Sequence, residues 1–258
     1  MIDPHSPTEI FGPLAQDYAR FRPSYPDALF DALASRVAGL RGHTLDVGSG
    51  TGVAASPLLA RGARVVALEP NPHMLAKARH RLSGSEGWVG AVAGRAESLP
   101  IATGAASCVT VAQAFHWFEP GPALAEMARV LMPEGVLALL WNVTVPDAFT
   151  DEVRDLISRY NPGYGRPVTR SMLATPEALA HHVAFSVERP AEFLHERAMT
   201  EDAYVGYAFS WSYCGGALSA AARIPFESEL RVAIRRHHPS GAWVERLVAV
   251  AHFARRST

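Results

Sequence analysis

Short apolar runs alternate with longer segments of mixed polarity between residues 44 and 142. Runs of this length, each followed by a turn and a helical pattern, predict strands that alternate with helices. The expected strands cover 45–47, 63–69, 88–93, 107–112 and 135–141, and the expected helices cover 53–60, 123–131 and a segment that starts after Pro70. The run at 135–141 is apolar throughout, which is typical of a strand covered on both faces. The alternation favours an α/β chain with a parallel, doubly wound sheet.

Both ends of the chain depart from this alternation. Before residue 44, Pro23 and Pro26 interrupt a segment rich in aromatic side chains and arginine, which predicts a short helix and then an extended stretch. A second helix is expected over 27–37, with Asp27 as its N-cap. After residue 142 the expected elements are helices at 149–160, 201–213 and 226–238, a loop at 161–167, and strands within 185–198 and at 247–254. Thr200 is the expected N-cap of the aromatic helix 201–213.

Composition narrows the class of protein. The chain has 258 residues, 48% of them hydrophobic, and a formal net charge of −1, so no global field draws it to nucleic acid or to an anionic membrane. We expect no membrane-spanning segment and no leader. Cys108 and Cys214 lack a C-x-x-C partner and are interpreted as free thiols in a reducing cytoplasm. The single lysine, Lys77, in an Ala- and Arg-rich chain suggests a bacterial source. The His and Arg residues of 231–238 and 181–182 lack metal-ligand spacing and indicate solvated surface.

A glycine-rich turn follows the first strand of the alternating region. Gly48, Gly50 and Gly52 allow positive φ and close approach of the backbone to a ligand, and the helix after them attracts a carboxylate or a phosphate. Dinucleotides and S-adenosylmethionine both use such turns. The dinucleotide fingerprint requires its third glycine where this chain has Val53, and it has no place for the carboxylate of Asp46, which could anchor an ammonium group. A turn without any ligand is the alternative.

Four segments carry a resemblance to a known family. The turn resembles the D/E-x-G-x-G-x-G motif of the class I S-adenosylmethionine-dependent methyltransferases. Residues 94–100 resemble the family's G-x-A-E-x-L-P stretch, and residues 113–118 are similar to the A-Q-A-F/L-H-W-F of a small-molecule group that includes the trans-aconitate-type enzymes. Residues 18–26 resemble a Y-x-x-x-R-P-x-Y-P lid that folds over the cofactor in several such enzymes, although a tethering helix would have a similar pattern. Together they favour a methyltransferase of the type 11 group.

The resemblance implies a fold and a division of the chain. The fold would be a doubly wound, mostly parallel, seven-stranded sheet of the Rossmann-like methyltransferase type, with an N-terminal lid and a C-terminal helical cap. Residues 1–43 would form the lid segment and a helix, 44–142 the cofactor-binding core, and 143–258 the remaining sheet with helices that cap the substrate. All three parts would belong to one structural domain. Whether the protein is a monomer or a homodimer stays open.

The implied cofactor is S-adenosylmethionine, with S-adenosylhomocysteine as product. Glu69 follows Asp46 by 23 residues, at the end of the second strand, where a carboxylate can bind both ribose hydroxyls. Arg95 replaces the aspartate that many relatives direct at adenine, so the Ala96 backbone and Glu97 are expected to bind adenine instead. Glu97 as a helix-capping carboxylate and Met74 as ordinary packing are open alternatives. The cofactor residues would be Tyr18, Arg22, Asp46, Gly48, Ser49, Gly50, Gly52, Glu69, Pro70, Met74, Ala96, Glu97, Gln113 and Ala114.

The acceptor would lie at the carboxyl ends of the central strands. His116 is the best-placed candidate base, and a role in shaping the wall or in binding substrate is the alternative. The expected substrate pocket consists of Tyr25, Phe115, Trp117, Trp141, Asn142, Tyr207 and Trp211. The helix 201–213 that carries the last two could also be entirely core. No metal site is expected.

The predicted reaction is an in-line displacement that moves a methyl group to a small molecule, as in secondary metabolism. Oxygen is the first choice of target atom, because the chain has neither a catechol-type metal cluster nor an N-P-P-Y-type motif. A protein that binds S-adenosylmethionine without transferring its methyl group is one alternative. An NAD(P)-dependent oxidoreductase is the other, disfavoured by Asp46, by Val53 and by the lack of a Tyr-x-x-x-Lys dyad.

Overall fold

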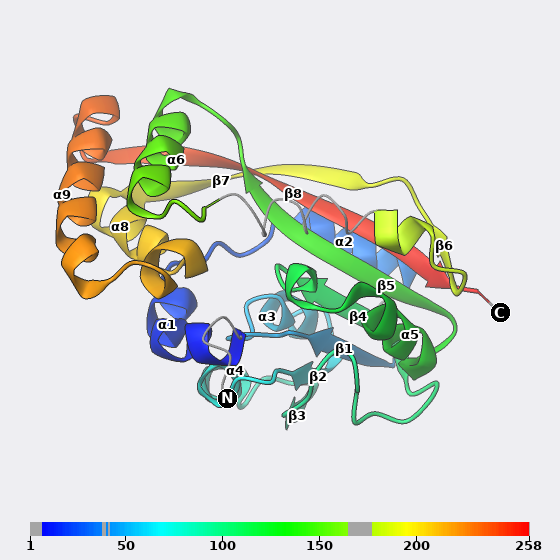
Figure 1. Cartoon of the computed structure of the whole chain (residues 1–258). Helices are drawn as coiled ribbons and strands as arrows, with labels where there is room; N and C mark the ends of the chain where they lie inside the picture. The colour runs from blue at the N-terminus through cyan, green and yellow to red at the C-terminus, as the bar shows by residue number, and fades with distance from the viewer. Residues whose placement is uncertain (1–6, 38–39, 41, 165–176, 258) are drawn as a thin grey trace.

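A computed structural model describes residues 7–37, 40, 42–164 and 177–257. One continuous sheet runs through the molecule, and the strand order is β3-β2-β1-β4-β5-β8-β6, with β7 also paired to β8 (Figure 1). The strands are β1 (His43–Val47), β2 (Arg64–Leu68), β3 (Trp88–Val92), β4 (Ala106–Ala112), β5 (Leu131–Thr144), β6 (Phe185–Val187), β7 (Ala191–Thr200) and β8 (Ala242–Arg256). The doubly wound, mostly parallel α/β fold expected from the sequence is confirmed.

The first five strands form the parallel part of the sheet. β1 lies between β2 and β4, and the chain winds outward from it in both directions. This reversal of winding opens a crevice at the carboxyl ends of the strands, where doubly wound sheets bind their ligands. β1 is almost fully buried from Thr44 to Val47, as its apolar run predicts.

The last strands run antiparallel. β8 pairs with β5 from Val136 opposite Arg255 to Thr144 opposite Leu247. On its other edge, β8 pairs first with β7 and then with β6, so the two short partners share one position beside it. The eight strands therefore occupy seven positions across the sheet. The sequence predicted one strand within 185–198, and the structure has two.

Helices cover both faces of the sheet. Apolar side chains of α2, α3 and α4 pack in one core cluster with strand residues that include Cys108. Side chains of α5 pack against the opposite face, with Val109 and Val111. Because successive residues of a strand point to opposite faces, the single apolar run of β4 supplies both cores. These helices are α2 (Asp27–Arg36), α3 (Ala55–Leu59), α4 (Pro72–Leu82) and α5 (Pro120–Val130).

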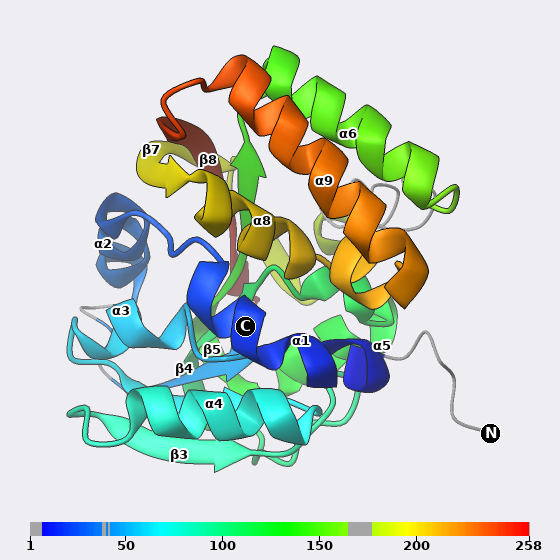
Figure 2. The same cartoon turned by 90° about the vertical axis from the view of Figure 1, so that its left-hand side faces the viewer.

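Most of the other helices that the structure describes form a cap at one end of the sheet, beyond the carboxyl end of β5 (Figure 1). The cap has its own apolar cluster, with Phe149, Tyr204 and Phe226 among its buried side chains. Figure 2 shows α1 between α4 and α8, so the N-terminal helix bridges the sheet layer and the cap. These elements are α1 (Pro7–Phe21), α6 (Ala148–Tyr160), α8 (Glu201–Phe209), the π-helical turn η2 (Ser212–Gly216) and α9 (Ala220–His237).

Several boundaries differ from those expected. Asp27 is the first residue of α2 and not its cap, because Pro26 holds the cap position without a side-chain hydrogen bond. Thr200 caps α8 as expected, but that helix ends at Phe209. The loop expected at 161–167 lies partly outside the described residues. Among the helices that the structure describes, none is long and apolar enough to cross a membrane.

Candidate functional site

Two cavities meet at the carboxyl ends of the parallel strands. The first has a volume of about 100 Å³ and lies over the ends of β1, β2, β3 and β4. Its lining residues are Tyr18, Gly48, Gly50, Glu69, Pro70, Met74, Gly94, Arg95, Ala96, Glu97, Ala112, Gln113, Ala114, Trp117 and Phe118. Ten of the fourteen residues that the sequence assigned to the cofactor are in this lining. The structure thus brings together segments that lie far apart in the chain.

Gly48 and Gly50 contribute only backbone atoms to the lining of the first cavity. Gly48 and Gly50 have φ values of +66° and +53°, which favour glycine. A Cβ atom on Gly48 would lie 2.6 Å from the Cβ of Ala114, so only glycine leaves the space between these two segments open. Gly52 has a different role. A Cβ atom there would lie 2.9 Å from Leu82 Cδ1 in α4, so Gly52 permits helix packing and does not line the cavity.

Glu69 presents a buried carboxylate to the first cavity. Its Oε2 accepts the backbone N–H of Gly50 at 3.0 Å, and its Oε1 accepts that of Asn71 at 2.9 Å. Burial raises the pKa of Glu69, while the two backbone donors act in the opposite direction. Each carboxylate oxygen can accept more than one hydrogen bond, so the carboxylate can still bind hydroxyl groups that enter the cavity.

Asp46 lies beneath the cavity and not on its wall. It is fully buried, and its Oδ1 accepts a hydrogen bond from Thr110 Oγ1 at 2.9 Å. Its Oδ2 is buried and has no hydrogen bond to the residues that the structure describes. Burial raises the pKa of Asp46 from 3.8 to about 7. A positive group in the cavity would stabilise the charged form of this buried carboxylate, directly or through a water molecule.

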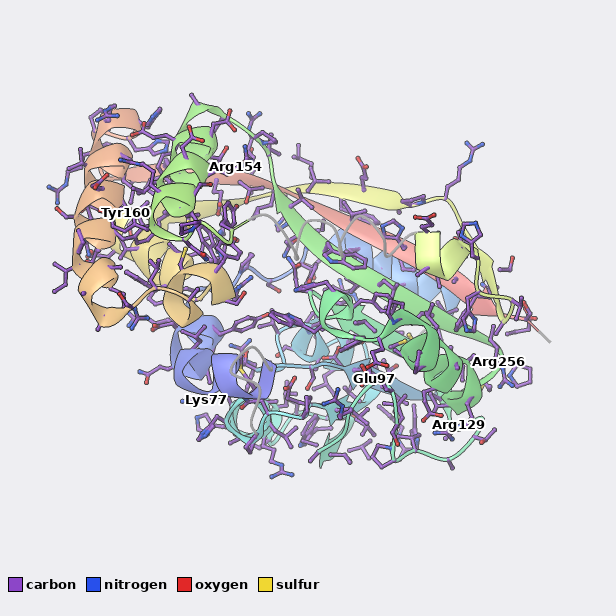
Figure 3. The ribbon with its side chains drawn as sticks, viewed as in Figure 1. Lys77, Glu97, Arg129, Arg154, Tyr160 and Arg256 are labelled. Carbon is purple, nitrogen blue, oxygen red and sulfur yellow. The ribbon has the colours of Figure 1, made fainter. Side chains whose placement is uncertain are left out.

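The outer end of the first cavity is lined by Met74 on α4 and by Ala96 and Glu97 after β3. Glu97 Oε1 accepts the backbone N–H of Glu119 at 3.0 Å, at the residue before α5, and Arg95 lies 3.5 Å from Glu97 Oε2. The helix-capping alternative for Glu97 is therefore present in the structure, together with its place in the lining. Figure 3 shows Glu97 in the sheet half of the molecule, away from the cap.

The second cavity lies between the sheet and the cap, and its volume is about 290 Å³. Its lining residues are Tyr18, Arg22, Gln113, His116, Trp117, Asn142, Val143, Thr144, Thr150, Val153, Arg154, Ile157, Tyr164, Tyr204, Tyr207, Trp211, Ser212 and Tyr213. It shares Tyr18, Gln113 and Trp117 with the first cavity. A group bound in one cavity can therefore contact a group bound in the other beside these three side chains.

Gln113 stands at the junction of the two cavities in a left-handed conformation, with φ +53°. Its backbone N–H bonds to the carbonyl of Leu140, and its Nε2 donates to the carbonyl of Asn142 at 2.9 Å. The Asn142 side chain donates to the carbonyl of Ser24 at 3.0 Å and also bonds to His195 Nε2 at 2.9 Å. This network holds a strained residue in place, as is common where a backbone positions a ligand.

Arg22 joins the N-terminal segment to the cap. Its Nε donates to Ser210 Oγ and its Nη2 to the Ser210 carbonyl, both at 3.1 Å. The guanidinium also lies over the ring of Tyr18, 4.6 Å from its centroid. Arg22 lines the second cavity but not the first. Arg22 also lines the third cavity, together with Gly48 and Ser49. Its expected place near the cofactor carboxylate therefore stays a prediction.

His116 lies on the wall of the second cavity, beside Trp117. Burial, and secondarily the charge of Arg22, lower its pKa to about 4. The imidazole is therefore neutral near pH 7 and a weak proton acceptor. This favours the wall or substrate-contact interpretation over that of a general base.

The other substrate-pocket assignments divide into two groups. Trp117, Asn142, Tyr207 and Trp211 line the second cavity. Phe115 and Trp141, expected there, are buried in the core instead. Trp141 lies in β5, where successive side chains point to opposite faces, and Phe115 is the first residue of the 3-10 helix η1 (Phe115–Trp117). Tyr25 and Ser49 line a smaller third cavity next to Arg22.

Sequence reasoning missed one whole wall of the second cavity. Thr150, Val153, Arg154 and Ile157 line it from α6, at the spacing of one helix face. Tyr164 was also missed, whereas Tyr204 and Tyr213 belong to the aromatic segment 201–213 that was expected to contact substrate. The helical periodicity of α6 was visible in the sequence, but an ordinary core face has the same pattern. Among the described residues, no group of three His, Cys, Asp or Glu side chains could hold a metal ion.

Comparisons with known proteins point to one family. A model of the methyltransferase domain matches residues 45–139. A protein of Mycobacterium tuberculosis named as an uncharacterized methyltransferase is 36% identical over 209 residues, which are 79% of this chain and 77% of the relative. The malonyl-[acyl-carrier protein] O-methyltransferase of Dechloromonas aromatica is 30% identical over 200 residues, 70% of each chain.

A solved structure from Anaeromyxobacter dehalogenans, assigned there as a type II methyltransferase, has the same fold. The TM-score is 0.66 at 24% identity, and the match covers 92% of this chain and 98% of the other. The matched domain begins in β1 and ends in β5, so it contains the glycine turn, Glu69 and the junction residue Gln113. The chain belongs to the class I S-adenosylmethionine-dependent methyltransferases, in the type 11 group.

Proposed function

We propose that this methyltransferase moves the methyl group of S-adenosylmethionine to an oxygen atom of a small molecule held in the second cavity. The observation that carries the proposal is the shared wall of the two cavities, Tyr18, Gln113 and Trp117. A donor in the first cavity and an acceptor in the second would meet there. Holding two reactants in such a geometry supplies a large part of catalysis in a displacement reaction.

The residues of the first cavity fit the cofactor. The open backbone at Gly48 and Gly50 would take its methionine part, and the Glu69 carboxylate would accept the ribose hydroxyls. Met74 and Ala96 would contact adenine. The unsatisfied Oδ2 of Asp46 fits an ammonium group above it. When bound, the cofactor supplies a methyl group activated by a positively charged sulfur.

Residues at the junction of the two cavities would stabilise the positive charge and orient the two reactants. The rings of Tyr18 and Trp117 present electron-rich faces that suit a positive charge. Gln113, fixed by its bond to the Asn142 carbonyl, would set the distance between donor and acceptor. Arg22 is hydrogen-bonded to Ser210, which links the end of α1 to the cap, and this link would keep water out of the junction.

Two observations support oxygen as the target atom. The relative from Dechloromonas aromatica is an O-methyltransferase by name. The second cavity also carries hydrogen-bond donors suited to an oxygen-rich acceptor, among them the guanidinium of Arg154 and the hydroxyls of Tyr204 and Tyr213. A general base is not required when the acceptor oxygen is already ionised.

The test combines binding with transfer. S-adenosylhomocysteine is titrated into the protein by calorimetry, with NAD and NADP as parallel controls. The protein is then incubated with methyl-labelled S-adenosylmethionine and a deproteinised small-molecule extract. We expect binding of S-adenosylhomocysteine alone and label in a small organic product as a methyl ester or ether. Binding without transfer would favour a cofactor-binding protein of another activity, and label on nitrogen or carbon would overturn the choice of oxygen.

A further inference from the structure

We propose that the acceptor is an aromatic carboxylic acid, which the enzyme converts to its methyl ester with Arg22 as the partner of the reacting carboxylate. This inference rests on the proposed function and deepens it. A carboxylate oxygen would form the new O–CH₃ bond while the S–CH₃ bond breaks, with the electron pair of that bond left on sulfur. The positive charge of the donor and the negative charge of the acceptor cancel, and no proton changes place.

The charge lining the second cavity favours an acid. Arg22 and Arg154 line it, and no aspartate or glutamate is among the lining residues that the structure describes. Asp151, which does not line the cavity, partly neutralises the charge of Arg154 through an ion pair of 2.7 Å. Both side chains of this pair are more than half exposed. Among the residues that the structure describes, Arg22 has no such carboxylate partner. Its Nε and Nη2 bond to Ser210, while its Nη1 donates to no described residue, so a guanidinium nitrogen is left for an anionic ligand.

Arg22 is also the arginine next to the junction. Its guanidinium lies over the ring of Tyr18, which lines both cavities. Its charge reaches His116 on the facing wall, where it helps to lower the pKa of the imidazole. A carboxylate that bound Nη1 of Arg22 with one oxygen would bring its other oxygen to the boundary between the cavities. Arg154 lies on α6, in the cap (Figure 3), and its exposure puts it where acids would enter.

Among the described residues that line this cavity, no side chain is a strong proton acceptor at neutral pH. Burial lowers the pKa of His116 to about 4. Burial raises the pKa values of Tyr18, Tyr204 and Tyr213, so these phenols stay protonated and act as donors. A phenol or an alcohol acceptor would have to lose a proton during transfer, and a protonated amine would have to lose one before it. A carboxylic acid is already ionised near pH 7 and needs no base.

The shape of the cavity favours a flat ring. Tyr164, Tyr213, Trp211 and Tyr207 form a continuous wall in which successive ring centroids are 4.8, 5.5 and 4.9 Å apart. Trp117 and Tyr18 also line the cavity. Aromatic rings prefer the offset and edge-to-face contacts that such a wall provides. The volume of about 290 Å³ is at the lower end for small-molecule sites, which suits one ring or a fused pair with a short acidic side chain.

The experiment uses matched probes and the full-length protein saturated with S-adenosylhomocysteine. Benzoic, cinnamic, naphthoic and indole carboxylic acids are each compared with the primary amide and with the saturated-ring acid. We expect at least one aromatic acid to bind about tenfold more tightly than both of its partners, and to yield a base-labile labelled methyl ester when S-adenosylmethionine replaces the product. Equal binding of acids, amides and saturated acids across the panel would overturn the inference. Failure of S-adenosylhomocysteine to bind would instead remove the proposed function.

Two variants separate the charge of Arg22 from its structural bond. Arg22→Gln removes the charge, and Ser210→Ala removes the hydroxyl that Arg22 Nε contacts while leaving the charge in place. We expect Arg22→Gln to abolish the preference for acid over amide, Arg22→Lys to restore part of it, and Ser210→Ala to retain it. Thermal unfolding checks that each variant is folded. A full acid preference in folded Arg22→Gln would overturn the role of Arg22, and its loss in Ser210→Ala would show that geometry and not charge selects the acceptor.

Discussion

Gly50 donates its backbone N–H to Oε2 of Glu69 at 3.0 Å, which ties the glycine turn after β1 to the end of β2. The other carboxylate oxygen accepts the N–H of Asn71, at the start of α4. One buried side chain therefore holds three segments together at the first cavity. The carboxylate that is expected to bind ribose is also the group that fixes the turn beneath it.

Glu69→Gln tests this double role. The amide has one oxygen and a donor NH₂, so it cannot accept from both Gly50 and Asn71, and one backbone N–H would face another donor. We expect a loss of about 1–3 kcal/mol in the free energy of unfolding, and at least about tenfold weaker binding of S-adenosylhomocysteine. Urea unfolding and calorimetry measure the two effects. Glu86→Gln, at an exposed position after α4, is the matched control. Unchanged cofactor affinity in Glu69→Gln would remove the ribose assignment.

The sequence predicted the sheet and much of the lining of the first cavity because both depend on local patterns. Apolar runs fix the strands, and the glycine turn follows directly from the need for positive φ at Gly48 and Gly50. Glu69 could be located because strand ends in a parallel sheet share one edge. Spacing could not reveal that Gly52 faces Leu82, since a glycine that serves packing and one that serves a ligand look alike in sequence.

The second cavity was harder to predict for a physical reason. Its walls come from α6, α8 and η2, whose positions depend on long-range packing around Phe226 and Tyr204 and not on local periodicity. Arg154 is indistinguishable in sequence from any solvated arginine on a helix. Trp141 lies in a segment expected to border the pocket, yet strand alternation turns its side chain toward His252, with ring centroids 5.5 Å apart.

The two glycines of the turn should respond differently to the same substitution. In Gly48→Ala the new Cβ would meet the Cβ of Ala114 at 2.6 Å, inside the lining of the first cavity. We expect folded protein whose affinity for S-adenosylhomocysteine falls at least about tenfold. In Gly52→Ala the clash is with Leu82 at 2.9 Å, and we expect about 1–3 kcal/mol lower stability with affinity near that of the wild type. Thermal unfolding and calorimetry compare the two. The reverse pattern would contradict the assigned roles.

Asp46 should make stability depend on pH. Its folded-state pKa, about 7, lies above the unfolded value of 3.8. The folded state therefore holds a proton that the unfolded state has lost. The contribution of this proton to the free energy of unfolding is fully present below pH 3.8 and is lost as the pH rises through about 7. Asp46→Asn can still accept from Thr110 but carries no charge.

The stability of Asp46→Asn relative to wild type should therefore increase between about pH 5 and about pH 8, by at most about 3 kcal/mol. Urea unfolding at both pH values measures the difference, so any constant cost of the new amide cancels. Asp155→Asn, at an exposed position of α6, is the control and should show no such change. A difference between Asp46→Asn and wild type that is the same at both pH values would contradict the buried titration.

His116 should prove dispensable as a base. With a pKa of about 4 it does not titrate near neutral pH, so kcat should stay flat between about pH 6 and about pH 9. His116→Gln keeps a polar wall and should lower kcat by less than about tenfold, whereas loss of a general base costs about 10²–10⁴-fold. The pH–rate profiles of both proteins are the measurement. A wild-type profile that rises with an apparent pKa near 7, and is flattened by His116→Gln, would restore the base.

Arg154 should affect the binding of the acceptor more than the methyl-transfer step. It lines the second cavity, yet 53% of its side chain is exposed, so its charge is felt by an acid that approaches from solvent. Arg154→Gln should lower kcat/KM for an acidic acceptor by about threefold to tenfold at low ionic strength, and the deficit should shrink as salt screens the charge. Arg159→Gln is the matched control, because Arg159 lies on the same helix, pairs with Glu229 and does not line the cavity. Steady-state kinetics at low and high salt distinguish the two variants. Arg154→Gln could instead lower kcat while KM and the salt dependence stay unchanged. That result would place Arg154 at the reacting atoms and would contradict its role in attracting the acid from solvent.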